Sequence, residues 1–252
     1  MWRKIYFLIV AFFWISKVGW SQPTLSSTSW NTWLIVNTLA DLNDKWSTGF
    51  EFHERTAEPF ATRSTLIMRP YLSRSLHPNI AVALGYSWVR SFPYSPFGPS
   101  VESIEHNAWE QFSAHLKRKY WLLETRIRME NRWIKPENAA LFFVNRLRVR
   151  LLFRQAIPLR KGFEVFGQLS DELFFQQNKY FVPEQLNTNW LTGGIGWGYK
   201  KKTEMVFSIQ QQLDRLGNEN YISRPIFWLS VLSHFNFIQK NPDPTPVHKD
   251  SF

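Results

Sequence analysis

The feature that most constrains the fold of this chain is an alternation of charged and apolar residues with a period of two. From Glu124 to Glu130 every second residue is charged, and the residues between are mostly apolar. The segment 146–151 repeats the pattern, with Arg at the even positions and Leu or Val at the odd ones. Successive side chains of a β-strand point to opposite faces, whereas a helix would scatter both sets around its circumference. The alternation therefore predicts β-strands with one charged and one apolar face.

Eleven segments of this kind recur along the chain, with turn residues between them. They span residues 29–39, 45–55, 63–75, 80–91, 104–117, 120–133, 141–156, 162–174, 187–199, 203–214 and 226–238. Almost all are long enough to cross a bilayer as tilted strands. Short connections alternate with longer ones, as in barrels with turns on one rim and loops on the other. The chain is thus predicted to be all-β, an up-and-down antiparallel transmembrane β-barrel of about 10–12 strands.

A soluble β-sandwich or barrel also alternates and is the competing fold. The length of the segments and the rows of Arg and Glu on the polar face favour the membrane barrel. Bacterial single-chain barrels have even strand numbers, so a count of eleven predicts that segment 29–39 lies outside the wall or that a strand is missed or split. Glu54 and Glu110 fall on the apolar face, which predicts a bulge or a register error near them.

Aromatic residues support the same interpretation. The chain has 13 Trp residues, and 17% of its residues are aromatic. In membrane barrels such rings form girdles at the interface, where the ring is half buried and its polar atom stays hydrated. Six Trp residues near predicted strand ends are assigned to such girdles: Trp30, Trp46, Trp88, Trp133, Trp190 and Trp197.

The first residues predict export. Arg3 and Lys4 precede an apolar run from Ile5 to Ile15, and a small-residue stop ends at Ser21, which together predict a cleavable signal peptide over residues 1–21. A buried N-terminal helix or a membrane anchor is the alternative, but the run is short for a membrane span. The barrel domain is then expected over residues 22–238, followed by a disordered polar tail over 239–252.

Composition narrows location and partners. The chain has no Cys, which excludes a disulfide framework, a Cys-ligated metal and a thiol-borne lipid anchor. The formal net charge of +10 falls to +7 when Arg3, Lys4 and Lys17 are removed with the signal peptide. We expect a location in the cell outer membrane. The expected partners are outer-membrane lipid, lipopolysaccharide, the barrel-assembly machinery and small anionic solutes, and export argues against nucleic acid.

A set of short patterns carries a family resemblance. They are His53-Glu54-Arg55, Glu105-x-Asn107-x-Trp109-Glu110-Gln111, Glu124-x-Arg126-x-Arg128-x-Glu130-x-Arg132, Arg146-x-Arg148-x-Arg150, Asp171-Glu172-Leu173-Phe174 and Gly196-Trp197-Gly198-Tyr199. In order and spacing they resemble domain-of-unknown-function family 2490 over nearly the whole mature chain. The resemblance implies an exported outer-membrane barrel of a didermal bacterium, with no established activity and hence no catalytic role to carry over.

The charged face predicts a network in the barrel lumen. Its expected members are Glu51, Arg55, Arg69, Glu105, Glu124, Arg126, Arg128, Glu130, Arg132, Arg146, Arg148, Arg150, Glu164 and Glu172. With Arg63, Arg154, Glu204 and Asp214, the inward set contains ten Arg and eight acidic residues. Such a near balance favours structural ion pairs over a specific anion site, although guanidinium groups suit carboxylate or phosphate.

Catalysis is not expected. Ser113-x-His115 places a hydroxyl and an imidazole on one strand face, but residues two apart on a strand are poorly placed for a hydrogen bond. The six His residues lack metal-ligand spacing, and no phosphate-binding glycine loop occurs, so neither a metal nor another cofactor is predicted.

The sequence therefore leaves two hypotheses for a barrel without catalytic activity and one alternative that is an enzyme. The barrel is a narrow, porin-like channel for small anionic solutes or a closed structural barrel, and the alternative is an outer-membrane lipid or acyl hydrolase using Ser113 and His115.

Overall fold

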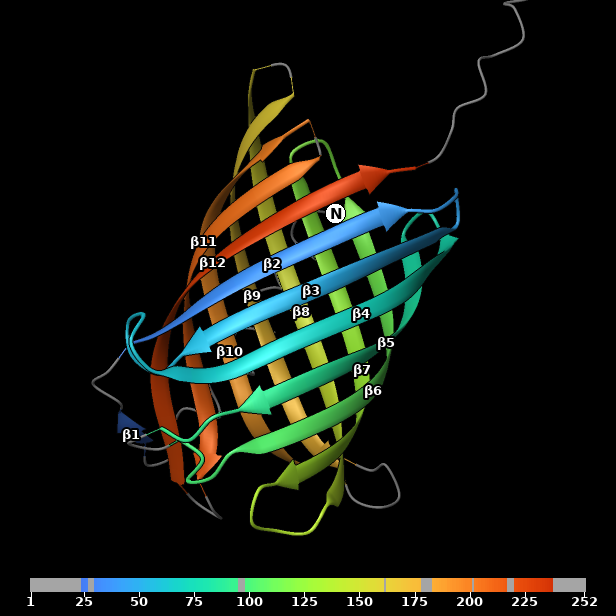
Figure 1. The fold of residues 1–252 in the computed structure, drawn as a ribbon. Helices are drawn as coiled ribbons and strands as arrows, with labels where there is room; N and C mark the ends of the chain where they lie inside the picture. The colour runs from blue at the N-terminus through green and yellow to red at the C-terminus, as the bar shows by residue number, and fades with distance from the viewer. Residues whose placement is uncertain are drawn as a thin grey trace, which may run out of the picture.

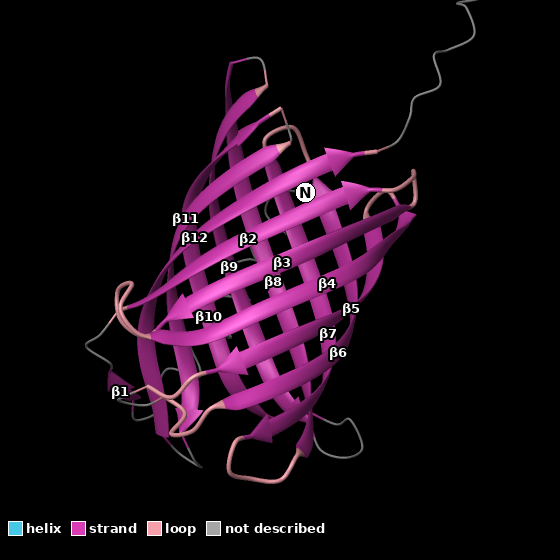
Figure 2. Ribbon diagram, in the orientation of Figure 1, coloured by secondary structure: helices cyan, strands magenta, loops and turns pink. Residues whose placement is uncertain are grey.

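The computed structural model describes residues 24–26, 30–94, 98–160, 162–177, 183–200, 202–216 and 220–237. The predicted signal peptide and the predicted polar tail lie outside these residues. The described residues form strands and connections (Figure 2), and they include no helix of the length and apolar character that a membrane span requires. Their strands are β1 (Thr24–Ser26), β2 (Asn31–Asp41), β3 (Trp46–Thr56), β4 (Arg63–His77), β5 (Ile80–Ser91), β6 (Ser103–Lys117), β7 (Trp121–Pro136), β8 (Phe142–Arg160), β9 (Phe163–Gln177), β10 (Pro183–Tyr199), β11 (Thr203–Leu216) and β12 (Asn220–Asn236).

Strands β2 to β12 form a closed barrel of eleven steeply tilted strands (Figure 1). Each pairs antiparallel with the next along the chain, and β12 closes the wall by pairing parallel with β2 from Ile226–Asn31 to Asn236–Asp41. The short strand β1 pairs parallel with the start of β12, so β1 and β2 follow one another along the same edge. The all-β barrel prediction is confirmed.

The expectation of an even strand number is wrong. Segment 29–39 corresponds to β2 and belongs to the wall, and no segment was missed within it. A parallel ladder satisfies the backbone donors and acceptors of two edge strands as an antiparallel one does, so closure does not require an even count.

The connections separate into two rims. At the first, which we call the short-turn rim, two to four residues join β2 to β3, β4 to β5, β6 to β7, β8 to β9 and β10 to β11. At the other, the long-loop rim, the longest connection has eleven residues, between β5 and β6. The connection between β11 and β12 is shorter than predicted, with three residues.

The outer face of the wall is apolar. Large side chains there remain more than one third exposed, including Leu84 at 67% and Ile195 at 66%. Others on this face are Leu34, Val36, Phe50, Met68, Phe112, Ile127, Phe207, Ile209 and Phe235. The alternation thus turns the apolar set outward and the charged set into the lumen.

The predicted irregularity occurs near only one of the two acidic residues on this outer face. A register shift lies between Arg55 and Thr56, next to Glu54, whose carboxylate accepts a hydrogen bond from Nε of Arg63 at 2.6 Å. Around Glu110 the ladders of β6 with β5 and β7 are uninterrupted, so the predicted register error there is wrong. Glu110 lies near the middle of its strand, exposed on the apolar face.

Glycines make room for aromatic rings inside the barrel. Trp109, only 2% exposed, lies against Gly85 so closely that a Cβ there would be 2.1 Å from the indole. The Nε1 of Trp109 donates to Oγ of Ser87 at 3.1 Å. Only a residue without a side chain permits this approach, so the ring fills this part of the lumen.

Candidate functional site

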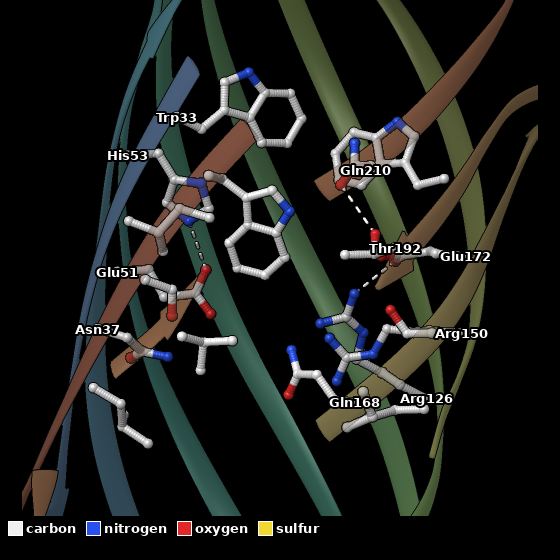
Figure 3. Close-up of a pocket in the computed structure, with 18 of the residues that line it drawn as sticks. Trp33, Asn37, Glu51, His53, Arg126, Arg150, Gln168, Glu172, Thr192 and Gln210 are labelled. Atoms are coloured by element: carbon white, nitrogen blue, oxygen red, sulfur yellow. Dashed lines mark hydrogen bonds and ion pairs between the residues drawn. The ribbon is translucent and has the colours of Figure 1, made fainter. Parts of the chain in front are cut away.

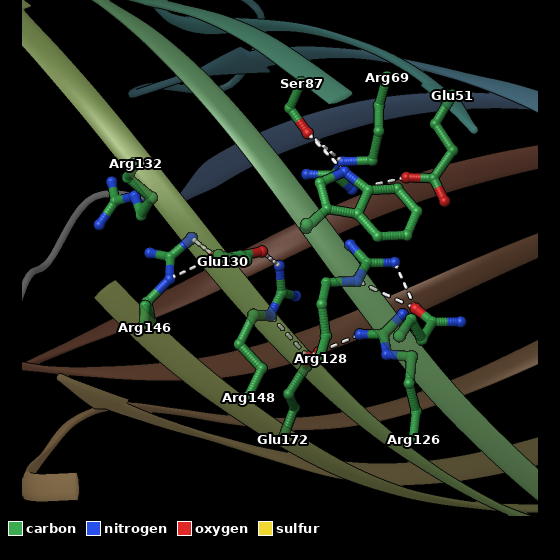
Figure 4. A network of polar contacts seen from close by, with 12 residues as sticks. Glu51, Arg69, Ser87, Arg126, Arg128, Glu130, Arg132, Arg146, Arg148 and Glu172 are labelled. Atoms are coloured by element: carbon green, nitrogen blue, oxygen red, sulfur yellow. Dashed lines mark hydrogen bonds and ion pairs between the residues drawn. The ribbon is translucent and has the colours of Figure 1, made fainter. Parts of the chain in front are cut away.

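The centre of the lumen is a chain of ion pairs on β7, β8 and β9 (Figure 4). Arg148 donates from Nη1 to Oε1 of Glu130 and from Nε to Oε1 of Glu172, both at 2.8 Å. Arg146 donates to the second oxygen of Glu130 at 2.6 Å, and Arg126 donates to Glu172 at 2.6 Å. Glu130 is fully buried and Glu172 is 5% exposed, so each carboxylate depends on two guanidinium groups in place of water.

A second cluster lies on β3 to β7, in the same close-up (Figure 4). Arg69 donates from Nη1 to Glu51 at 2.6 Å and from Nε to Oγ of Ser87 at 2.9 Å. Arg128 donates from Nε and Nη2 to Oε1 of Gln111, and its Cζ lies 4.1 Å from the ring centroid of Trp109. This cluster joins adjacent strands through charged, amide and aromatic groups together.

Further pairs extend the network towards both rims. Arg132 forms a bidentate pair with Glu105 at 2.6 and 2.8 Å near the long-loop rim. Towards the short-turn rim, Arg150 pairs with Glu124 at 2.5 Å. Arg154 on β8 pairs with Glu204 on β11 at 2.9 Å, bridging strands that are not neighbours.

Three predicted members stand apart from these ion pairs. Arg55 and Arg128 have no carboxylate partner in the part of the chain that the structure describes. Glu164 points into the lumen beside Gly198, and it forms no ion pair with any described residue. The structure brings together the other eleven predicted lumen residues, each in an ion pair with another inward side chain.

A cavity of about 390 Å³ lies within the lumen (Figure 3). Its charged lining consists of Arg55, Arg69, Arg126, Arg148, Arg150, Arg154, Glu51, Glu124, Glu172 and Glu204, together with His53. Aromatic and aliphatic side chains complete the wall, among them Trp33, Trp190, Trp228, Leu152, Val206 and Leu232. We call this space the lumenal chamber.

Five of the six predicted girdle residues lie on the outer side of the barrel. Trp30, Trp133 and Trp197 are 45%, 39% and 37% exposed. Trp46 contacts Arg74 on the outer face, and Trp88 lies between the outward residues Met68 and His106. These rings occur near both rims.

Two predictions of side-chain direction are wrong. Trp190 points inward, with its ring centroid 5.2 Å from that of Trp33 and 4.6 Å from that of Phe174. Arg63 lies on the outer face, with a side chain 57% exposed. The register shift after Arg55 skips one residue of β4, so the side chain of Arg63 points outward where an uninterrupted strand would point it inward.

The Ser–His pair of the hydrolase alternative is not assembled. Ser113 and His115 both point inward, and Oγ of Ser113 donates to the backbone oxygen of Ala81 at 3.4 Å, not to His115. The described residues contain no group of three His, Cys, Asp or Glu side chains that could hold a metal ion.

Several residues that build the lumen are not among those that the sequence assigned to it. Trp33 and Trp109 fill it, and Gln111 and Ser87 accept hydrogen bonds from arginines. Arg224 pairs with Asp214 and donates from Nη1 to the Tyr94 hydroxyl at 3.1 Å. Strand parity predicts the inward direction of Trp33 and Trp109, since Trp109, for example, shares its strand face with Glu105. The contact between Tyr94 and Arg224 joins residues 130 apart in sequence, so no local pattern predicts it.

Fold and lumen together define a closed eleven-stranded barrel with an ion-paired interior. The chain belongs to the family described as protein of unknown function (DUF2490), whose model matches residues 30–222. The family resemblance seen in the sequence is thereby confirmed. No curated protein and no solved structure matches the chain.

Proposed function

We propose that this protein is an outer-membrane β-barrel with a narrow, anion-preferring lumen. The observation that carries the proposal is the opposition of the two faces: exposed apolar side chains outside, and buried, paired charges inside. A soluble barrel would bury its apolar face, whereas a bilayer covers it. Aromatic rings near both rims support the same environment.

The side chains that cross the lumen favour restricted passage of small solutes over free diffusion through a wide pore. An eleven-stranded barrel lies between barrels that side chains fill and those that leave a wide aqueous channel. The Arg154–Glu204 pair and the contact of Trp33 with Trp190 join strands that are not neighbours. At the long-loop rim, Tyr94 in the β5–β6 connection reaches Arg224 on β12. These contacts also favour a closed structural barrel as the second candidate.

Charge sets the expected solute preference. Arg55 and Arg128 lack carboxylate partners among the described residues, so the lumen keeps positive charge that its own acids do not neutralise. Guanidinium groups attract carboxylates and phosphates, so anions are the expected solutes.

Planar bilayer recordings test the proposal. We expect small conductance steps, with a reversal potential in a KCl gradient that shows anion preference. The absence of steps in every salt would overturn the passage and favour the closed barrel. Cation preference would overturn the role given to the two arginines. A protein that stays soluble and monomeric without detergent would overturn the membrane assignment.

A further inference from the structure

We propose that the lumenal chamber is a binding site for a small organic dianion, a dicarboxylate or a phosphate monoester, with Arg55 as its anchor. The inference deepens the proposed function by naming a ligand class, and it rests on that function only in using the same lumen. It does not require conduction, since a closed barrel would contain the same chamber.

Arg55 is a cation that lacks a charged partner. Its Cζ lies 3.8 Å from the ring centroid of Trp33 and 5.6 Å from that of Trp190. In the described part of the chain it forms neither a hydrogen bond nor an ion pair, and its Nε is buried. Other lumenal arginines, such as Arg69 and Arg148, form ion pairs with glutamates. Arg55 lacks such a carboxylate partner among the described residues. A half-buried charge without a charged partner is a candidate contact for a ligand of opposite charge.

The charge of the chamber lining favours a divalent anion. Six Arg and four Glu side chains line the cavity, so two positive charges remain when His is counted as neutral. A ligand with two negative charges would balance the lining, and a monoanion would leave one charge over. Water could fill the space, but it carries no charge and cannot compensate for this excess.

Hydrogen-bonding groups around the chamber point to an acceptor-rich ligand. Several of its residues appear in Figure 3, with Trp33 and His53 on one side and Gln210, Arg126 and Arg150 on the other. Seven buried N–H donors on the lining have no acceptor among the described residues: Nε of Arg55, Arg126, Arg150 and Arg154, Nε1 of Trp190 and Trp228, and Nε2 of Gln210. The unpaired buried acceptors on the same lining are Oδ1 of Asn37 and Nδ1 of His53. These atoms have almost no accessible surface, so a ligand meets them only when their side chains rotate towards the chamber. Carboxylate and phosphate oxygens are acceptors that would then satisfy the donors, because they accept several hydrogen bonds and donate few.

The size and apolar part of the chamber indicate an organic ligand over a bare ion. A volume of about 390 Å³ falls in the range of small-molecule pockets. Indole rings and the side chains of Leu152, Val206 and Leu232 offer apolar contact beside the donors. Inorganic phosphate would leave this surface unused, so a dianion with a small apolar body fits the lining better.

Isothermal titration of the purified, detergent-solubilised barrel tests the site. The probes are phthalate and phenyl phosphate, compared with the monoanion benzoate and with inorganic phosphate. We expect both dianions to bind the wild type at least tenfold more tightly than benzoate, and inorganic phosphate to bind more weakly than phenyl phosphate. Absence of binding by both dianions, or benzoate binding equally well, would overturn the proposal.

Two substitutions locate the binding. Arg55→Gln should weaken dianion binding at least tenfold, whereas Arg74→Gln should leave it unchanged. Arg74 is a matched control because its Cζ also lies over an indole, 5.3 Å from the Trp46 centroid, but on the outer face. Equal affinity in Arg55→Gln and wild type would refute the site. If Arg55→Gln does not fold, Trp190→Phe removes one donor and keeps a ring, and it should weaken binding at least threefold; unchanged binding would again refute the site.

The outcomes separate this inference from the proposed passage. A barrel that conducts anions but binds neither dianion would refute the site alone. A barrel that binds the dianions through Arg55 but gives no conductance would refute the passage alone.

Discussion

Replacing Arg148 by Ala tests whether the lumenal ion pairs hold the wall together. Arg148 is 6% exposed and donates to both Glu130 and Glu172. Removing one partner of a buried ion pair costs about 3–5 kcal/mol. Because Arg146 and Arg126 still pair with these carboxylates, we expect the low end, about 3 kcal/mol. Loss of the contact with the Phe174 ring, at 4.4 Å, adds about 1 kcal/mol.

Urea titration of the barrel refolded into lipid vesicles measures this cost, with migration of unheated samples on a gel as the readout of the folded state. Arg63→Ala is the matched control, since its pair with Glu54 is outside and its side chain is 57% exposed. Exposed pairs contribute about 0–1 kcal/mol, so the control should remain near wild type. A loss below about 1 kcal/mol in Arg148→Ala would refute the structural role. If folding survives and anion preference falls, Arg148 serves the solute instead.

Three further substitutions probe the wall. Ile209→Arg places a charge at an outward-facing position in the middle of β11. It should lower the free energy of unfolding in vesicles by about 2–4 kcal/mol, measured by the same urea titration, and unchanged stability would contradict the membrane assignment. Gly85→Val should lower the free energy of unfolding by about 1–3 kcal/mol or more, because its Cβ would meet Trp109, and a neutral result would mean that the ring can move aside. Glu110→Leu should raise the urea midpoint in vesicles, since it removes an exposed carboxylate from the apolar face, and a lower midpoint would indicate a partner for that carboxylate.

The two faces of the wall could be predicted from the sequence because alternation is a local property. The charged rows at 124–132 and 146–150 point inward as expected, and the eleven segments correspond to the eleven wall strands. The closing pair could not be inferred in this way. Both parallel and antiparallel seams satisfy edge strands, and parity alone does not exclude either.

Trp190 shows that strand parity predicts the direction of a side chain better than its distance from the strand end does. It lies seven positions before Trp197 in the same predicted strand, and an odd spacing places two side chains on opposite faces of a regular strand. Trp197 is outside and Trp190 inside, so both could not belong to one girdle. Proximity to a strand end was a weaker guide than parity.

The pairing of particular charges was beyond the sequence. Which Arg meets which Glu depends on the stagger between strands, and a bulge such as that after Arg55 changes the face without altering composition. The bridge from Arg154 to Glu204 also depends on how far the barrel is sheared and how wide it is. For the same reason, the count of inward charges predicted an excess of arginine but could not identify Arg55 and Arg128 as the two inward arginines without a carboxylate partner among the described residues.

The parallel seam between β2 and β12 restricts how this architecture can be rearranged. Since β2 starts at one rim and β12 ends at the other, a linker joining them would have to run the length of the tilted strand β2, about 36 Å for its eleven residues. A short linker can join the ends of an even-numbered barrel in a circular permutation, but it cannot join the ends of this one. Gain or loss of a hairpin changes the strand number by two and leaves it odd. A lineage of such barrels can widen or narrow its lumen by hairpins while every member keeps a parallel seam.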